Sequence, residues 1–288
     1  MIEIKTAEEI EKMIKVGKIL GDCFDYLSQF IEPGVSTYKL DELAEKYLRK
    51  HGCIPSFKGY EGFPGSICAS VNDVLIHGIP SRKVVLKEGD IISIDMGNIL
   101  DGYNGDAART YKVGQVSKEA SRLIECTQKC FFEAYKEARV GNHLSDISAK
   151  ISDVAKEYGY STTKEFGGHG IGRDMHEDPF IFNYGTKGHG IILRKGMCLA
   201  IEPMIHQGSD KIVQLPDGWG IKSADGKLTC HFENTIYIDD DGPHITTVDS
   251  IVKGYLSNVE RWFYCCWCYG IRNFTAMLFS STWKWNSD

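Results

Sequence analysis

Two segments of the chain carry nearly the same pattern 107 residues apart. They read LKEGDIISID at residues 86–95 and LRKGMCLAIE at residues 193–202. Each combines a charged turn containing glycine, a short apolar run typical of a buried strand, and a final carboxylate, Asp95 or Glu202. An acid at the end of a buried strand is costly unless it is paired, hydrogen-bonded or bound to a cation. The repetition predicts an internal duplication in which each half directs one acid into a shared site.

The same offset continues upstream, in a pair of predicted helices. Gly34 and Gly52 in the first half correspond to Gly141 and Gly159 in the second. Between these glycines, apolar residues recur at i, i+4, i+7 and i+8, which indicates an amphipathic helix closed by glycine. They are Leu40, Ala44, Tyr47 and Leu48, and then Ile147, Ile151, Val154 and Ala155.

A longer helix is predicted before each of these. The first follows a capping box at residues 6–9 and is expected to stop at residues 33–34, a Pro-Gly pair. The second carries an apolar stripe over residues 120–134. Each half is therefore expected to run helix, helix and then strands, with a last short strand over residues 245–248 finishing the second half.

Composition and charge limit the possible classes of protein. No linker rich in Pro, Ser or Gly divides the 288 residues, so we expect one pseudo-symmetric domain. The net charge of −6 gives no basic surface for nucleic acid or an anionic membrane. The N-terminus enters an amphipathic helix without a signal-peptide core, and no cysteine before residue 250 belongs to a CxxC pair. We therefore expect reduced thiols and a cytoplasmic location.

Asp95 and Asp106 flank a strong hairpin signal. The turn is Asp101-Gly102, so the two acids are expected on adjacent antiparallel strands with their side chains on one face. Neighbouring carboxylates repel each other unless a proton or a metal lies between them. The pair therefore indicates a cation site.

Three residues of the second half complete a plausible ligand set. Glu202 lies in AIEPM, Glu233 in the alternating segment TCHFENTIYI, and His169 among glycines that allow close backbone approach. Four carboxylates and one imidazole suit a pair of divalent cations. Two such cations can activate a water and polarise a carbonyl together.

In combination, these motifs resemble type I methionine aminopeptidases. The resemblance runs from about residue 2 to 249 and rests on GGHGIG (167–172), IEPM (201–204), FENT (232–235) and the two aspartates eleven residues apart. SVNDVLIHGIP (70–80) and MHEDP (175–179) strengthen it. The resemblance implies an α/β fold of the α+β type, the pita-bread fold, with two pseudo-twofold-related halves around an antiparallel sheet. The 107-residue offset agrees with that fold.

The resemblance also implies a role for each ligand. Asp95 would chelate one of two divalent metal ions, Asp106 and Glu233 would bridge both, and His169 and Glu202 would complete the second. The metal-bound water would attack the scissile carbonyl, with Glu202 as proton shuttle. The sequence does not choose among cobalt, manganese, iron and zinc, because all accept these ligands.

Two further histidines and an apolar pocket follow from the same resemblance. His176 would hydrogen-bond the substrate carbonyl and the developing oxyanion, and His77 would contact the scissile amide or the substrate near its N-terminus. A pocket lined by aromatic and sulfur-containing side chains would suit a methionine thioether. It maps onto Phe57, Tyr60, Phe63, Cys68, Phe166, Met175 and Trp219.

The implied activity is removal of the initiator methionine from nascent polypeptides whose second residue is small. The expected partners are nascent N-termini at the ribosome, and we expect a monomer. Two alternatives remain open at this stage. One is an Xaa-Pro peptidase or creatinase-like hydrolase, which would usually carry a separate N-terminal domain. The other is a pita-bread binding protein without catalysis, in which the five ligands would be expected to have eroded.

The sequence departs from the family pattern at two places. Asn234 follows Glu233 where histidine is expected in many relatives, which leaves the surroundings of Glu233 open. After Asp249 the resemblance ends. We therefore predict a catalytic domain over residues 1–249 and an atypical extension over 250–288. Cys265, Cys266 and Cys268 lack the second pair that a zinc site needs. The extension could pack on the body, bind a partner or be foreign to the enzyme.

Overall fold

The computed structural model describes residues 2–257, and its contacts divide the chain into two units, Met1–Asp249 and Ser250–Asp288. The division falls at the predicted domain boundary. Of the predicted extension only residues 250–257, which are helical, are described, so the three cysteines of the tail lie outside the described residues. Within the described part, no helix has the length and apolar character needed to cross a bilayer.

The first unit contains four long helices, one short 3₁₀ helix and fifteen strands. The helices are α1 (Ala7–Ser28), α2 (Thr37–Lys50), α3 (Lys118–Glu137), α4 (Leu144–Glu157) and η1 (Tyr60–Gly62). The strands of the first half are β1 (Ile54–Pro55), β2 (Cys68–Val71), β3 (Val74–Ile76), β4 (Ile91–Leu100) and β5 (Tyr103–Lys112). Those of the second half are β6 (Ser161–Thr162), β7 (Gly167–Gly170), β8 (Glu177–Phe182), β9 (Cys198–Ile201), β10 (Met204–His206), β11 (Ile212–Gln214), β12 (Ile221–Ser223), β13 (Thr229–His231), β14 (Glu233–Asp239) and β15 (Gly242–Ile245).

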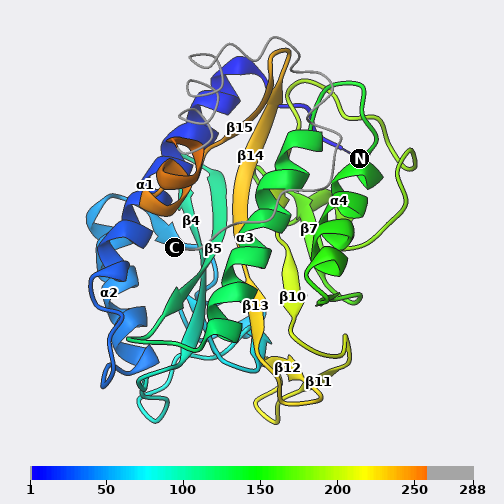
Figure 1. The fold of residues 1–288 in the computed structure, drawn as a ribbon. Coiled ribbons are helices and arrows are strands. Elements are labelled where there is room, and N and C mark those ends of the chain that lie inside the picture. The colour runs from blue at the N-terminus through cyan, green and yellow to red at the C-terminus, as the bar shows by residue number, and fades with distance from the viewer. Residues whose placement is uncertain (1, 258–288) are drawn as a thin grey trace, which may run out of the picture. The chain divides into compact units, whose positions relative to one another are not determined.

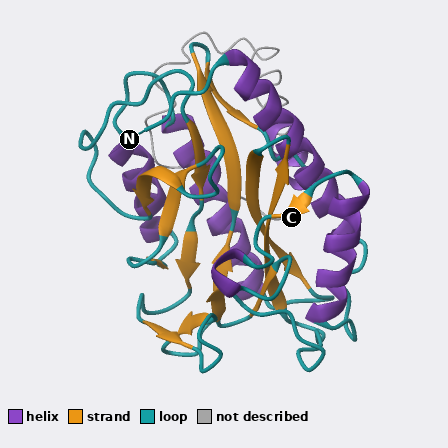
Figure 2. Ribbon diagram, turned by 180° about the vertical axis from the view of Figure 1, so that it is seen from behind, coloured by secondary structure: helices purple, strands orange, loops and turns teal. Residues whose placement is uncertain are grey.

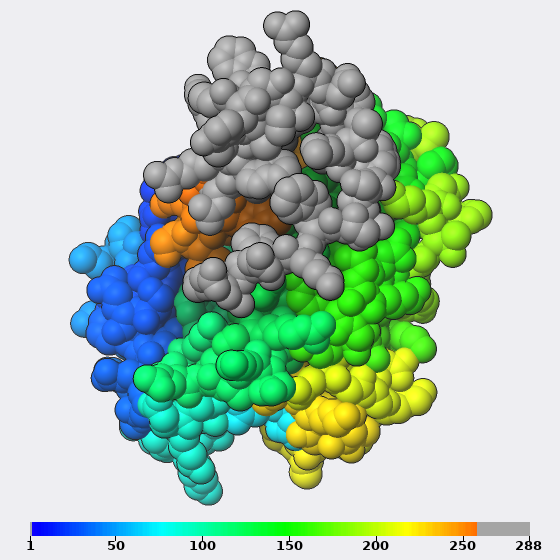
Figure 3. All heavy atoms as spheres, in the orientation of Figure 1, coloured from blue at the N-terminus to red at the C-terminus, as the bar shows by residue number. Residues whose placement is uncertain are grey.

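A nine-stranded antiparallel sheet forms the centre of this unit. Its main path runs β1-β4-β5-β14-β9-β7-β8, with β2 beside β4 and β15 beside β14. Two small sheets, β13-β10-β6 and β11-β12-β3, complete the strand structure. The long helices lie on one side of the sheet, with α3 in front of the strands in Figure 1 and the strands toward the viewer from behind in Figure 2. In the space-filling view from the same side, the green atoms of the α3 and α4 region form part of the surface (Figure 3).

The predicted duplication is confirmed in the positions of the elements. Helices α2 and α4 start and end 107 residues apart, as do the strands β1 and β6, and β4 and β9 start 107 residues apart. Two isolated bridges repeat the relation, Ser36 with Val85 and His143 with Ile192. The halves meet where β5 pairs with β14 in the middle of the sheet. The antiparallel pita-bread architecture inferred from the sequence is therefore correct.

The boundaries of two predicted elements are wrong. Helix α1 begins at the predicted capping box, but it ends at Ser28 rather than at Pro33. The amide of Phe30 bonds back to Leu27, and Phe30 packs against the core, so the chain leaves the helix early. A last strand was expected over residues 245–248 but lies at 242–245. Thr246 and Thr247 instead bond through their side chains to the strand that carries Glu233.

Helix α1 lies unusually close to the last residues of the unit. Gly17 and Gly21 are both buried in the helix, and their lack of a side chain permits the approach. A Cβ atom on Gly17 would lie 2.5 Å from Oγ1 of Thr246. One on Gly21 would lie 2.4 Å from the carbonyl oxygen of Val248. Helix α1, near the N-terminal end of the unit, therefore packs directly against the residues at its C-terminal end.

We predict that Gly21→Ala destabilises the protein. Helix propensity alone would favour alanine by about 1 kcal/mol, but a backbone carbonyl cannot move aside as a flexible side chain can. Overpacking of this kind costs about 1–3 kcal/mol. Urea unfolding should therefore show a lower midpoint for Gly21→Ala, whereas Lys15→Ala on the exposed side of the same helix should stay near wild type. A raised midpoint for Gly21→Ala would show that the helix has room to move.

Candidate metal centre

The two aspartates lie side by side on the hairpin that the sequence predicts. β4 pairs with β5 through the turn at residues 101–102, and Asp95 lies opposite Ala108 while Asp106 lies opposite Gly97. The acids are thus two positions apart in register, so their side chains extend from the same face of the sheet. The expected placement on adjacent strands is confirmed.

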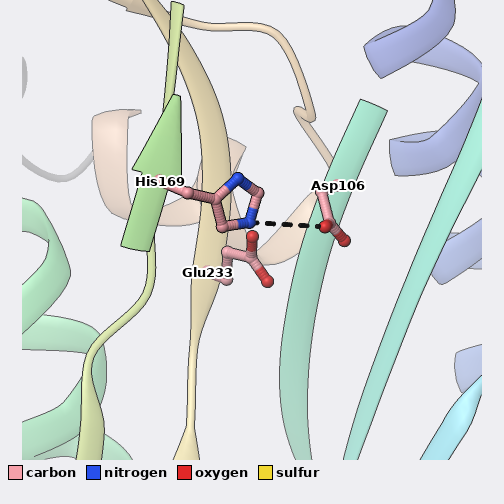
Figure 4. Close-up of side chains that lie close together, drawn as sticks. All are labelled: Asp106, His169 and Glu233. Carbon is pink, nitrogen blue, oxygen red and sulfur yellow. Dashed lines mark ion pairs between the residues drawn. The ribbon is translucent and has the colours of Figure 1, made fainter. Parts of the chain in front are cut away.

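Second-half residues meet these acids across the middle of the sheet. His169 comes from β7, Glu233 is the first residue of β14, and Glu202 directly follows β9. Nε2 of His169 lies 3.8 Å from Oδ2 of Asp106 and 3.8 Å from Oε1 of Glu202. Figure 4 shows His169, Asp106 and Glu233 pointing toward one another from three strands. Ligand atoms of these three residues lie within 4.8 Å of one another.

The ring of His169 is held in the tautomer that a metal ligand needs. Its Nδ1 lies 2.8 Å from the carbonyl oxygen of Gly170, so Nδ1 carries the proton and donates to that oxygen. Nε2, which faces the carboxylates, is therefore left with its lone pair. Burial lowers the pKa of His169 to about 4, which keeps the ring neutral at physiological pH.

Burial raises the pKa values of all four carboxyl groups, and repulsion from neighbouring acids adds to the effect at Asp95, Asp106 and Glu233. Burial raises the pKa of Asp95 to about 7. The pKa of Asp106 is well above its ordinary value because of burial and the neighbouring carboxylates of Asp95 and Glu202. Burial also raises the pKa of Glu202 and of Glu233, and at Glu233 repulsion from the other acids raises it further. The protein alone therefore does not neutralise this cluster.

The donor set fits divalent cations. Oδ1 of Asp95, Oδ1 of Asp106 and Oε1 of Glu233 are buried and have no hydrogen-bond partner among the residues that the structure describes. Buried oxygens of this kind need a partner, and a cation would supply one while offsetting the repulsion among the acids. Carboxylate oxygens with one imidazole nitrogen are ligands that Mn, Fe, Co and Zn accept.

His231 is a candidate that the sequence reasoning missed. Its Nε2 lies 3.5 Å from Oε2 of Glu202 and 3.8 Å from Oε2 of Glu233, and the three residues form a second possible ligand group. Burial lowers its pKa. The sequence did contain a signal for His231. Residues two apart in an extended segment share a face, and His231 precedes Glu233 by two, so its side chain could have been expected on the same face as that acid.

Arg109 is the buried cation beside this centre. It is fully buried and pairs with Asp249, with 2.8 Å between Nε and Oδ2. Its guanidinium also donates to the backbone carbonyl of Glu233 and to Oδ1 of Asn234. Asn234, left open by the sequence, therefore supports Arg109. The arginine fixes the strand that carries Glu233 and lowers the pKa of that acid against the effect of burial.

A cavity of about 500 Å³ opens beside the cluster. It is lined by all of the predicted site residues: His77, Asp95, Asp106, His169, His176, Glu202 and Glu233, and the pocket residues Phe57, Tyr60, Phe63, Cys68, Phe166, Met175 and Trp219. Phe57, Phe63, Cys68 and Met175 form one buried cluster against which Trp219 packs. Phe166 packs in a neighbouring cluster, and Tyr60 lies partly exposed.

The two histidines outside the ligand set also face the cavity. Nδ1 of His176 lies 3.0 Å from the hydroxyl oxygen of Tyr60, and its ring packs edge-on against His169. His77 adopts a φ of 59°, a left-handed conformation that is uncommon for a residue other than glycine. Burial lowers the pKa of both rings, that of His77 to about 4. Both are therefore neutral imidazoles at physiological pH.

Several lining residues were not predicted from the sequence. Besides His231, they include Ile76, Glu61, Asp178 and Phe180. Ile76 belongs to the core, but Glu61, Asp178 and Phe180 are exposed, so they lie at the mouth of the cavity. Whether a residue lies at the mouth of a cavity depends on how distant segments are arranged in the fold. A local sequence pattern therefore does not predict it.

The comparisons agree with this geometry. Residues 11–240 match the model of metallopeptidase family M24. The chain is 49% identical over 248 residues to the methionine aminopeptidase of Clostridium acetobutylicum, a match covering 86% of this chain and 99% of that protein. It is 47% identical to methionine aminopeptidase 1 of Bacillus subtilis, again covering 86% of this chain and 99% of that protein.

Solved structures give the same result. The crystal structure of methionine aminopeptidase from Rickettsia prowazekii superposes with a TM-score of 0.85 at 39% identity, covering 86% of this chain and all of that chain. A prolidase from Pyrococcus furiosus shares only the fold, with a TM-score of 0.70 at 24% identity. The chain therefore belongs to metallopeptidase family M24 and, within it, to the methionine aminopeptidases.

We expect a divalent cation to stabilise the fold through the carboxylate cluster. Saturation to about 100 times the dissociation constant contributes about 2.7 kcal/mol, which is about 5–10 °C in Tm for a domain of this size. Addition of Mn²⁺ or Co²⁺ to chelator-treated protein should give this shift, and Asp106→Asn should lose most of it. Asp101→Asn, an exposed acid in the turn of the same hairpin, is the matched control. Equal shifts in both variants would place the cation elsewhere.

Proposed function

We propose that this protein removes the N-terminal methionine from polypeptides whose second residue is small, by hydrolysing the first peptide bond. The observation that carries the proposal is the joint placement of the acid–histidine cluster and an apolar, sulfur-lined pocket in one cavity. The cluster provides hydrolytic chemistry, and the pocket provides selectivity for an unbranched thioether side chain.

We propose that the site holds two divalent metal ions. Their ligands would be Asp95, Asp106, His169, Glu202 and Glu233. Glu233 contributes to both candidate ligand groups, as expected of a bridging carboxylate. When bound, the ions would supply Lewis-acid polarisation of the scissile carbonyl and a more acidic water. The remaining chemistry falls to the side chains around them.

Glu202 is the proposed proton carrier. It lines the cavity, and burial raises its pKa. A carboxyl group with a raised pKa can accept a proton from water and return it to the leaving amine near neutral pH. Its two oxygens lie near different rings, Oε1 3.8 Å from Nε2 of His169 and Oε2 3.5 Å from Nε2 of His231.

His176 is the proposed donor to the developing oxyanion. With the hydroxyl of Tyr60 donating to Nδ1, the proton of the neutral ring resides on Nε2, from which it can be donated to the substrate carbonyl. His77, held in its unusual backbone conformation, would contact the scissile amide or the substrate near its N-terminus. Tyr60 would thus act as a positioning residue for His176 in addition to bordering the pocket.

The proposal includes the substrates' source, the location of the enzyme and its catalytic domain. We propose that the substrates are nascent chains at the ribosome, that the enzyme acts in the cytoplasm as a monomer, and that residues 1–249 form the catalytic domain. The buried pair of Arg109 and Asp249 supports this boundary, because Asp249 belongs to the interior of the first unit.

We predict that His176→Ala lowers kcat about 10²–10³-fold, the loss typical of one oxyanion donor. Bound metal, measured by elemental analysis, should be unchanged. Tyr60→Phe should cost a smaller factor, about 3–10-fold, because it removes one hydrogen bond that orients the ring. Tyr158→Phe, which loses a hydroxyl bonded to Glu125 outside the cavity, is the control. Loss of metal in His176→Ala would move this residue into the ligand set.

Substrate choice tests the proposed activity itself. Peptides beginning Met-Gly and Met-Ala should be cleaved in the presence of metal, those beginning Met-Lys and Met-Leu poorly, and Xaa-Pro peptides not at all. A cramped site for the second residue is the physical reason for the first contrast. Preferential cleavage of Xaa-Pro bonds would favour the prolidase-like alternative. No cleavage of any peptide by metal-loaded protein would favour a binding protein.

A further inference from the structure

An exposed row of aromatic side chains leads away from the mouth of the cavity. Phe180, Phe182 and Tyr184 are 45%, 47% and 39% exposed, although large apolar side chains of this kind are usually covered. Their rings contact one another in sequence, with centroid distances of 4.8 Å from Phe180 to Phe182 and 5.4 Å from Phe182 to Tyr184. We call these three residues the aromatic row.

The row is continuous with the cavity. Phe180 is itself a lining residue, together with His169 and Gly167 on the neighbouring strand. A Cβ on Gly167 would lie 3.0 Å from Cζ of Phe180, so the glycine lets the ring lie over β7. Along β8, residues 179 and 181 are buried whereas 180 and 182 are exposed, so Phe182 continues the face that Phe180 presents to the cavity.

The strand that carries the row is also an edge. Among the described residues, β8 pairs with β7 alone and ends the main path of the nine-stranded sheet. An extended peptide can lie along such an edge, with alternate side chains directed toward the same row. Phe180 and Phe182 lie on β8, which ends at Phe182, and Tyr184 follows in a bend.

We propose that the aromatic row binds the segment of the substrate polypeptide that follows its second residue, and that it favours apolar side chains there. This inference rests on the proposed function, because it concerns the same substrate. A polypeptide with its first residue in the pocket must leave through the mouth, which Tyr60 and Glu61 border on one element and Asp178 and Phe180 on another. The exposed aromatic surface continues beyond Phe180 along β8.

The test is a set of hexapeptides that share Met-Ala at the start. One continues with four serines, and two carry leucine at alternate positions, Ser-Leu-Ser-Leu or Leu-Ser-Leu-Ser. For the metal-loaded wild-type enzyme, one leucine peptide should have a kcat/KM about tenfold above the serine peptide, which corresponds to about 1.4 kcal/mol. The gain should appear in KM rather than kcat, because contacts away from the reacting atoms are made equally in the ground and transition states.

Two variants assign the preference to the row. Phe182→Ser should bring the leucine-to-serine ratio close to one, and Tyr184→Ser should reduce it. Val213→Ser is the matched control, since Val213 is also 47% exposed on a strand but lies outside the cavity, and its ratio should equal that of wild type. A ratio within twofold of one in the wild type would overturn the proposal, as would an unchanged ratio in Phe182→Ser.

The outcomes separate this inference from the function on which it rests. Cleavage of the serine peptide without any preference for leucine would refute the row and leave the aminopeptidase intact. No cleavage of any methionyl peptide would refute the proposed function itself. The remaining alternative is that the aromatic row joins two copies of the chain, which sedimentation equilibrium would detect. If the wild type is a dimer and Phe182→Ser is a monomer, the row is a contact between copies, and its proposed role in substrate binding is wrong.

Discussion

The burial of four carboxylates at the middle of one sheet is the constraint on which the structure depends. Carboxylates at this spacing raise each other's pKa. Arg109, a fully buried cation, partly offsets this repulsion, because it pairs with Asp249 and donates to the strand that carries Glu233. Loss of one partner of such a buried pair costs about 3–5 kcal/mol. One arginine balances only part of the charge, so the centre favours a cation supplied from outside the chain.

The duplication explains how this charge can be concentrated without a long irregular loop. Each half contributes one acid where its apolar run ends, Asp95 in β4 and Glu202 after β9. The two central strands, β5 and β14, then add Asp106 and Glu233. The four acids line one cavity, while the long helices lie together on one side of the sheet (Figures 1 and 2). The face with the acids therefore remains free to form a cavity.

The sequence predicted what depends on local pattern and spacing. The capping box of α1, the hairpin at residues 101–102 and the 107-residue offset are all local signals, and the structure confirms each of them. Four of the five proposed ligands were recognisable because buried strands rarely carry acids, and His169 because of the glycines around it. All five line one cavity, although their roles stay predictions. Arg109 escaped notice because its partners lie more than 100 residues away in the chain. His231 was missed although it precedes Glu233 by only two residues, because its contact with Glu202 depends on the fold. The early end of α1 has the same origin, since tertiary packing of Phe30 overrides the Pro-Gly signal.

The cavity and the aromatic row differ in the physical means by which they would select a substrate. The pocket around Phe63 and Met175 is buried, so it would discriminate by shape, because a side chain larger than the pocket would not enter. The row is open to solvent, so it can only add contact area and cannot exclude a residue. Strict selection would thus be confined to the first two residues of a polypeptide, and the following residues would change the rate only by degree. Such a division suits an enzyme whose substrates share methionine and a small second residue and differ beyond them.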